Sequence, residues 1–80
     1  MTRVVVDVML KPEILDPQGQ AVERALPSLE LHGVTTVRIG KHIELDVADD
    51  VTDAAALAAE VADKLLANPV IEEYTVRLEA

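Results

Sequence analysis

The stretch VTTVRIGKHIELDV, residues 34–47, decides the fold, because it can form either one bent strand or the two strands of a hairpin. A two-residue turn at Gly40-Lys41 would place Ile39 opposite His42 and would mix apolar and charged side chains on one face. Read straight through, the apolar positions from Val37 onward have odd numbers, as in a single strand: Val37, Ile39, Ile43, Leu45 and Val47. The pattern predicts one long strand over residues 34–47 that bends at Gly40, and a hairpin with an extra bulge residue is the alternative.

The segment before this strand predicts a first strand over residues 3–11 and then a helix. The first strand is partly apolar on both faces, which indicates that its second face meets another chain or a second layer. Asp16 is the expected N-cap of the helix, with Pro17 in its first turn, and Gly33 is expected to close it. Pro27 predicts either a kink or an early end, because proline removes one backbone hydrogen bond.

The segment after the long strand predicts a second helix and a last strand. The helix is expected to start within residues 49–52, capped by Asp50 or Thr52, and to stop at Asn68-Pro69. The last strand is expected over residues 70–78. The order β-α-β-α-β predicts a single α+β domain over residues 1–80: a small antiparallel sheet with two helices on one face, and sheets joined across a dimer. A ferredoxin-like β-α-β-β-α-β order is the alternative.

Size and composition indicate that this domain needs support from outside itself. A chain of 80 residues buries only about 60% of its unfolded surface, so its stability is marginal. The sequence has no cysteine, which excludes disulfides, thiolate metal sites and a cysteine nucleophile. Tyr74 is the only aromatic residue. Self-association or a partner protein is therefore the expected source of further burial.

The charge of the chain excludes several classes of partner. The formal net charge is −8, with 15 acidic against 7 basic residues, which argues against binding nucleic acid or an anionic membrane. No apolar run approaches the roughly 20 residues of a membrane span. The N-terminus lacks the pattern of a signal peptide. A cytoplasmic protein is expected.

The residues that could carry chemistry are few and scattered. Ser28 is the only serine, and His32 and His42 lie on different predicted elements, so no catalytic triad is indicated. The acidic run at residues 46–50 lacks the glycine turn and distal glutamate of a calcium loop. The three glycines lie too far apart for a phosphate-binding loop. The sequence thus predicts no catalytic, cofactor-binding or metal-binding residue in this chain.

A few residues instead suggest contact with another protein. Gly19 is a poor helix former in a first turn, which suggests that something packs closely on that backbone. Arg38 and Lys41 flank Gly40 and could meet an acidic partner. The simpler interpretations are a capped helix start and a bent strand with solvated charges. The candidates for a partner interface are Asp16, Gln18, Gly19, Arg38, Gly40, Lys41 and Asn68.

Three segments together resemble the PurS family, the small subunit of phosphoribosylformylglycinamidine synthase. They are LDPQGQAVERAL (residues 15–26), VRIGKHIEL (residues 37–45) and KLLANPVIEEY (residues 64–74), after a first strand that ends in LK at residues 10–11. The resemblance covers nearly the whole chain. The sequence departs from the family pattern at Pro27, which affects only the shape of the first helix.

The resemblance implies a place in de novo purine biosynthesis. The complete enzyme converts formylglycinamide ribonucleotide, glutamine and ATP to the amidine, glutamate, ADP and phosphate. A PurQ-type glutaminase releases ammonia, and a PurL-type synthase binds ATP, magnesium and the nucleotide. The PurS-like chain would then be a non-catalytic assembly subunit, a homodimer or tetramer that bridges the two and helps ammonia transfer. The alternative is a stand-alone regulatory domain of ferredoxin-like type that binds a small metabolite.

Overall fold

The computed structural model describes residues 1–79, which form a three-stranded antiparallel sheet in the order β2-β1-β3. The strands are β1 (Thr2–Leu10), β2 (Lys41–Val47) and β3 (Glu72–Glu79). The first strand is central, because it pairs with β2 on one edge and with β3 on the other. The expected α+β class and antiparallel sheet are confirmed.

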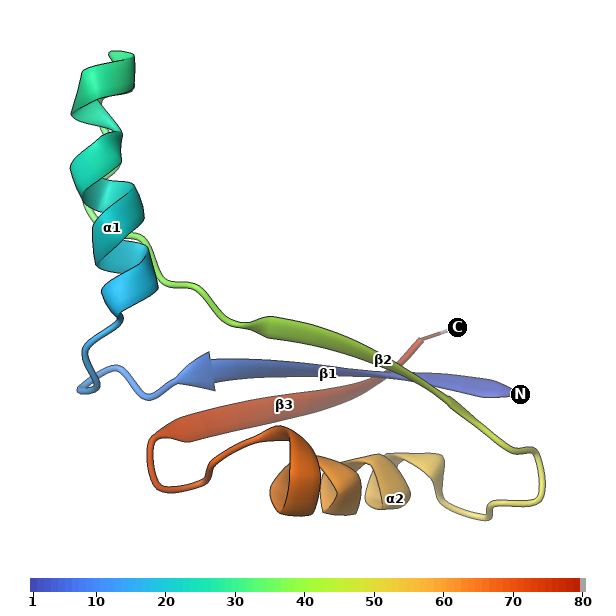
Figure 1. Ribbon diagram of the computed structural model, residues 1–80. Helices are drawn as coiled ribbons and strands as arrows, with labels where there is room; N and C mark the ends of the chain where they lie inside the picture. The colour runs from blue at the N-terminus through green and yellow to red at the C-terminus, as the bar shows by residue number, and fades with distance from the viewer. Residues whose placement is uncertain (80) are drawn as a thin grey trace.

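One face of this sheet carries the core. Val6 lies between Ile43 and Val76, and Val4 lies between Leu45 and Leu78. Helix α2 (Ala54–Val61) and the π-helical turn that follows it (Ala62–Leu66) lie along this face (Figure 1). The small side chains of α2 let it approach the valines closely. The buried core consists of Val4, Val6, Val8, Val47, Ala58 and Ala62.

The prediction of one bent strand over residues 34–47 assigned the apolar side chains to the correct face but made the strand too long. Ile43 and Leu45 share the core face, as the odd-number pattern requires. Strand pairing begins only at Lys41, however, and residues 34–40 are extended with no strand partner among residues 1–79. The hairpin alternative, and with it a fourth ferredoxin-like strand, does not form. The reason is that the N–H groups of Val37 and Ile39 donate to carboxylates of Glu23 and Asp16.

The first helix is shorter than predicted. Helix α1 (Pro17–Ala25) is followed by a 3₁₀ turn (Pro27–Leu29), so the early end is correct and closure at Gly33 is wrong. Pro27 has no N–H to continue the helical ladder. Glu30 then takes the left-handed conformation, with φ of 59°, and reverses the chain.

Only one helix covers the sheet, which corrects the prediction of two helices on one face. Helix α1 stands beyond the end of the sheet, with the extended segment 34–40 running back alongside it (Figure 1). We call residues 12–40 the arm, and the sheet with α2 the body. The chain measures 52 × 27 × 14 Å, and its radius of gyration is 16.1 Å. A compact domain of this length would have a radius of gyration of about 12 Å.

The second face of the sheet carries charged side chains, and its expected contact with another chain stays a prediction. Val5 is fully buried, yet its neighbours across the strands are Glu44 and Arg77 rather than apolar residues. Charged side chains of the same chain therefore cover this face. The cap of α2 is Asp53 and not Asp50 or Thr52, because the carboxylate of Asp53 accepts the Ala56 N–H at 3.0 Å.

Candidate partner interface

Asp16 joins the two chain segments at the base of the arm. One carboxylate oxygen accepts the Gly19 N–H at 2.9 Å, which caps α1, and the other accepts the Ile39 N–H at 2.7 Å. The residue is 5% exposed. The hydrogen bond from Gly19, followed by that from Ile39, lowers the pKa of Asp16 below its ordinary value. The charged carboxylate is thus held firmly in place.

Arg38 makes the reciprocal connection. Its guanidinium donates to the carbonyl oxygens of Ile14 and Lys11, each at 3.0 Å, and to that of Leu10 at 3.5 Å. These carbonyls belong to the end of β1 and the loop before α1. The planar fork of arginine suits this task, because its donors reach several acceptors at once. The positive charge predicted for an acidic partner is therefore engaged within the chain.

The two glycines of this region stand where the backbone passes close to itself. A Cβ atom on Gly19 would clash with the carbonyl oxygen of Val37 and lie 2.9 Å from a carboxylate oxygen of Asp16. A Cβ atom on Gly40 would clash with the carbonyl oxygen of Val8 and with the sulfur of Met9. Close packing on the Gly19 backbone was predicted, and the structure provides it from the same chain.

The remaining sequence candidates lie apart from this group. Lys41 donates to the carbonyl of Leu66 at 2.9 Å, at the end of the π-helical turn. The side chain of Asn68 accepts the Val70 N–H at 3.1 Å and so forms the turn before β3. Gln18 is exposed. The structure thus brings Asp16, Gly19, Arg38 and Gly40 together, and a partner role for any of the seven candidates stays a prediction.

The surface best suited to a partner is the apolar side of the arm. Val22 is 39% exposed, Leu29 65%, Leu31 53% and Val34 54%. Val22 and Leu29 belong to the stripe that a helix ordinarily buries. Because α1 stands away from the sheet, these side chains are covered only in part by residues 1–79. The sequence reveals the stripe but not its exposure, which depends on the position of the helix.

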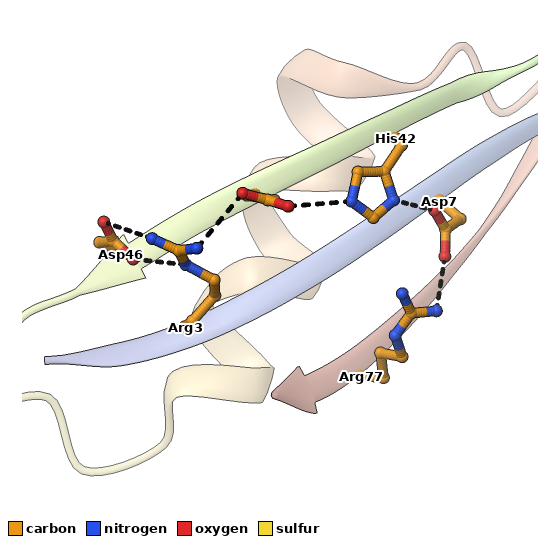
Figure 2. Close-up of polar contacts among 6 residues, drawn as sticks. Arg3, Asp7, His42, Asp46 and Arg77 are labelled. Carbon is orange, nitrogen blue, oxygen red and sulfur yellow. Dashed lines mark hydrogen bonds and ion pairs between the residues drawn. The ribbon is translucent and has the colours of Figure 1, made fainter. Parts of the chain in front are cut away.

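The open face of the sheet carries a chain of alternating charges (Figure 2). Arg3 pairs with Asp46 at 3.0 Å and with Glu44 at 3.4 Å. His42 lies 2.8 Å from Asp7 and 3.1 Å from Glu44, and Asp7 also pairs with Arg77 at 3.0 Å. The network joins all three strands through charged side chains that pair with one another.

The neighbours of His42 favour its charged form. Both ring nitrogens face carboxylate oxygens, which are acceptors, and only the doubly protonated ring can donate to both. The hydrogen bond to Asp7, followed by that to Glu44, raises the pKa of His42 above its ordinary value. In the same network, Arg3 lowers the pKa of Asp46. Sequence reasoning noted His42 only as a scattered histidine, because its partner Asp7 lies 35 positions away.

The described residues offer little to an enzyme mechanism. Among residues 1–79, no three histidine, cysteine, aspartate or glutamate side chains are placed to hold a metal ion. No described helix has the length and apolar character needed to span a membrane. What the fold presents is a sheet covered by one helix and a projecting arm with exposed apolar side chains (Figure 1), features typical of the class of small proteins that contact other proteins.

Comparison with known proteins identifies the family of this chain. Residues 3–80 match the family described as PurS, phosphoribosylformylglycinamidine (FGAM) synthase. The PurS subunit of Mycobacterium leprae is 50% identical over 80 residues, covering 100% of this chain and 99% of that protein. That of Bacillus subtilis is 47% identical over 79 residues, covering 99% and 94%. This chain belongs to the PurS family.

Solved structures agree in fold. The Bacillus subtilis PurS structure in its C2 crystal form superposes with a TM-score of 0.89, at 46% identity, covering 100% of both chains. A chain in the structure of PurLQS from Thermotoga maritima superposes with a TM-score of 0.86 at 33% identity, covering 98% of this chain and 96% of that one. The resemblance stated from the three sequence segments is confirmed.

Proposed function

We propose that this chain, a PurS-type subunit of phosphoribosylformylglycinamidine synthase, bridges the glutaminase and the synthase of that complex and helps ammonia pass between them. Its contribution to the ligase is assembly, and the chain carries no reacting group. The observation that carries this proposal is the arm, which projects beyond the end of the sheet (Figure 1) and exposes apolar side chains of Val22, Leu29, Leu31 and Val34. Such a surface on a small chain is a site for another protein.

The partners follow from the relatives. The Thermotoga maritima structure is named PurLQS, and one of its chains has the fold of this protein. We infer a PurQ-type glutaminase and a PurL-type synthase as partners of this chain too. ATP and magnesium would bind to the synthase, which leaves this subunit without a cofactor. The cytoplasm is the compartment we expect for such a complex.

The extended segment 34–40 supports association with a second copy. The N–H groups of Val37 and Ile39 point toward α1, since they donate to Glu23 at 3.0 Å and to Asp16 at 2.7 Å. The N–H groups of Thr36 and Arg38, which alternate with these two along the segment, have no hydrogen-bond partner within residues 1–79. One edge of an extended segment is thus open to a strand of another chain. We propose a homodimer, or a tetramer built from it, that uses this edge.

The metabolite-binding alternative has weaker support. The largest groove, of about 490 Å³, is wide and open, and it lies between Met9 and Glu73 of the sheet and Thr36 and Arg38 of the arm. A small-molecule site ordinarily encloses most of its ligand. Arg38, the one cation in this groove, already donates to main-chain carbonyls.

Reconstitution tests the proposed function. Purified glutaminase and synthase are assayed for amidine formation with glutamine or with ammonium chloride, with and without this chain. We expect the glutamine-dependent reaction to require the chain and the ammonia-dependent reaction to proceed without it. The chain alone should neither release ammonia from glutamine nor hydrolyse ATP. Glutamine-dependent synthesis at the full rate without the chain would overturn the proposal.

A further inference from the structure

The base of the arm is built as a rigid joint. Two chain segments cross there: residues 10–16, which leave the sheet, and residues 37–40, which return to it. Asp16 of the outgoing segment accepts the Ile39 N–H, and Arg38 of the returning segment donates to the carbonyls of Lys11 and Ile14. Each segment therefore holds the other through a charged side chain bonded to main-chain groups.

Close backbone packing supports the same joint from both sides. The backbone at Gly19 lies so close to the Val37 carbonyl that an added Cβ atom would clash with it. The backbone at Gly40 lies equally close to the Val8 carbonyl. Charge-assisted hydrogen bonds are short and directional, so they resist bending more than apolar contacts do. The arm cannot swing relative to the sheet without breaking several of these bonds together.

We propose that Asp16 and Arg38 are positioning residues for glutamine-dependent synthesis: they fix the angle of the arm to the body and so fix how the bound enzymes face each other. The inference rests on the proposed function, because a bridge transfers ammonia only when it holds its partners at a set distance. Neither residue needs to touch a partner or a reacting group. Asp16 is almost wholly buried, which suits an internal role.

Two conservative substitutions weaken the hydrogen bonds of the joint and keep a polar side chain at each position. Asp16→Asn keeps one acceptor oxygen but places an amide donor against an N–H donor. Arg38→Lys keeps the positive charge but loses the planar fork that reaches separate carbonyls. Asp53→Asn is the matched control for the first, because Asp53 caps α2 through the Ala56 N–H and accepts no second hydrogen bond among residues 1–79. Arg3→Lys is the control for the second, since Arg3 pairs with exposed carboxylates on the sheet.

Each variant is titrated against fixed glutaminase and synthase, and the plateau of glutamine-dependent synthesis is recorded with the concentration at half-plateau. A misplacement of about 1 Å can cost about a hundredfold in rate, so we expect the plateau to fall at least about tenfold for both joint variants. Ammonia-dependent synthesis should stay unchanged, and both controls should reach the wild-type plateau. A subunit that is only less stable would need a higher concentration but would reach the same plateau, and that result would overturn the inference.

A distance measurement tests the joint without the partner enzymes. The chain has no cysteine, so two introduced cysteines would be its only attachment sites for spin labels. Ser28→Cys places one label on the arm, and Asp63→Cys places the other on the π-helical turn that follows α2. Labelled chains diluted with unlabelled ones report distances within one subunit. We expect the distribution to broaden in Asp16→Asn and Arg38→Lys and to stay narrow in the two controls. Unchanged widths, or failure of both joint variants to fold, would overturn the inference.

The two experiments separate this inference from the proposed function. If the wild-type chain does not support glutamine-dependent synthesis, the proposed function fails while the spin-label distances still decide whether the joint fixes the arm. If the wild-type chain supports synthesis and the joint variants do so equally well at the plateau, the proposed function stands and the inference fails.

Discussion

The two helices of this chain begin with the same local device and serve different ends. Asp16 and Asp53 each accept the N–H of the third residue after them, at 2.9 and 3.0 Å. Asp53 is exposed and starts a helix that packs on its own sheet. Asp16 is buried, makes a second bond to Ile39, and starts a helix that leaves the sheet.

The second oxygen of a capping carboxylate, which the helix itself does not need, can therefore direct tertiary structure. At α2 the apolar stripe meets the valines of the sheet, and the cap only starts the helix. At α1 the cap also binds the segment 34–40 through Ile39, and the helix stands away from the core. The apolar residues of α1 are then available to a partner.

Exchanging glycine and alanine at equivalent positions gives the largest contrast in stability. Gly19→Ala introduces a methyl group against the Val37 carbonyl, and overpacking of this kind costs about 1–3 kcal/mol. The equivalent residue of α2 is Ala56, and Ala56→Gly should cost at most about 1 kcal/mol through helix propensity. Urea unfolding of the isolated subunit measures both. A stabilised Gly19→Ala variant would show that the Val37 segment yields to the new methyl group.

Removing the two caps gives the next contrast. Asp53→Ala should destabilise the chain by the ordinary cost of one lost cap, about 1 kcal/mol. Asp16→Ala should destabilise it roughly twice as much, because the Ile39 N–H loses its acceptor as well. Thermal unfolding monitored by circular dichroism compares them. Equal shifts in the midpoint would mean that the bond to Ile39 adds nothing to stability.

The pH dependence of stability distinguishes Asp16 in the arm from His42 in the sheet. The lowered pKa of Asp16 adds stability above the ordinary carboxyl range, and this is lost as pH falls through the pKa in the folded state. The raised pKa of His42 adds stability below the ordinary imidazole pKa, about 6.5, and this is lost as pH rises through the value in the folded state. Asp16→Asn should reduce the loss of stability, measured as the urea midpoint, as pH falls below the ordinary carboxyl range. His42→Gln should reduce the loss of stability as pH rises above the ordinary imidazole pKa. A His42→Gln variant with the wild-type loss of stability over this rise in pH would contradict the assignment.

Changing an exposed apolar residue of the arm should have the smallest effect on the isolated chain. Leu29 is 65% exposed, so Leu29→Ser should alter the free energy of unfolding by no more than about 0.5 kcal/mol. The same substitution should raise the subunit concentration needed for half-maximal glutamine-dependent synthesis, because it removes apolar contact area from the proposed docking surface. A large loss of stability would indicate that Leu29 packs inside the folded subunit.

Local signals in the sequence predicted the elements, and long-range contacts decided the arrangement. The odd-numbered apolar positions placed Ile43 and Leu45 on the core face, and Pro27 ended α1, because both effects act within a few residues. The bond from Ile39 to Asp16 spans 23 positions, and no periodicity reveals it. Without that bond, α1 was placed on the sheet. The cap of α2 was missed for another reason, since several acidic residues in a row fit the same signal.

The candidate site was predicted in part. Gly19 was singled out because a glycine in a first turn needs a reason, and the close approach of Val37 supplies one. Arg38 was noted for its charge, whereas its contacts are with carbonyl oxygens of the chain itself. Glu23, which holds the Val37 N–H, gave no signal, because a glutamate on a helix surface is ordinarily solvated.

The joint between Asp16 and Ile39 also bears on how the chain folds. Strands β1 and β2 are antiparallel neighbours, yet the whole arm lies between them, so their pairing must bring distant segments together. Closing such a loop costs entropy before any strand contact repays it. Once Asp16 binds Ile39, the ends of β1 and β2 are already adjacent, and the ladder can extend from Val8 and Lys41 as if from a short turn. We expect the base of the arm to act as the nucleus of the sheet, so that Asp16→Asn slows refolding more than it speeds unfolding in stopped-flow experiments.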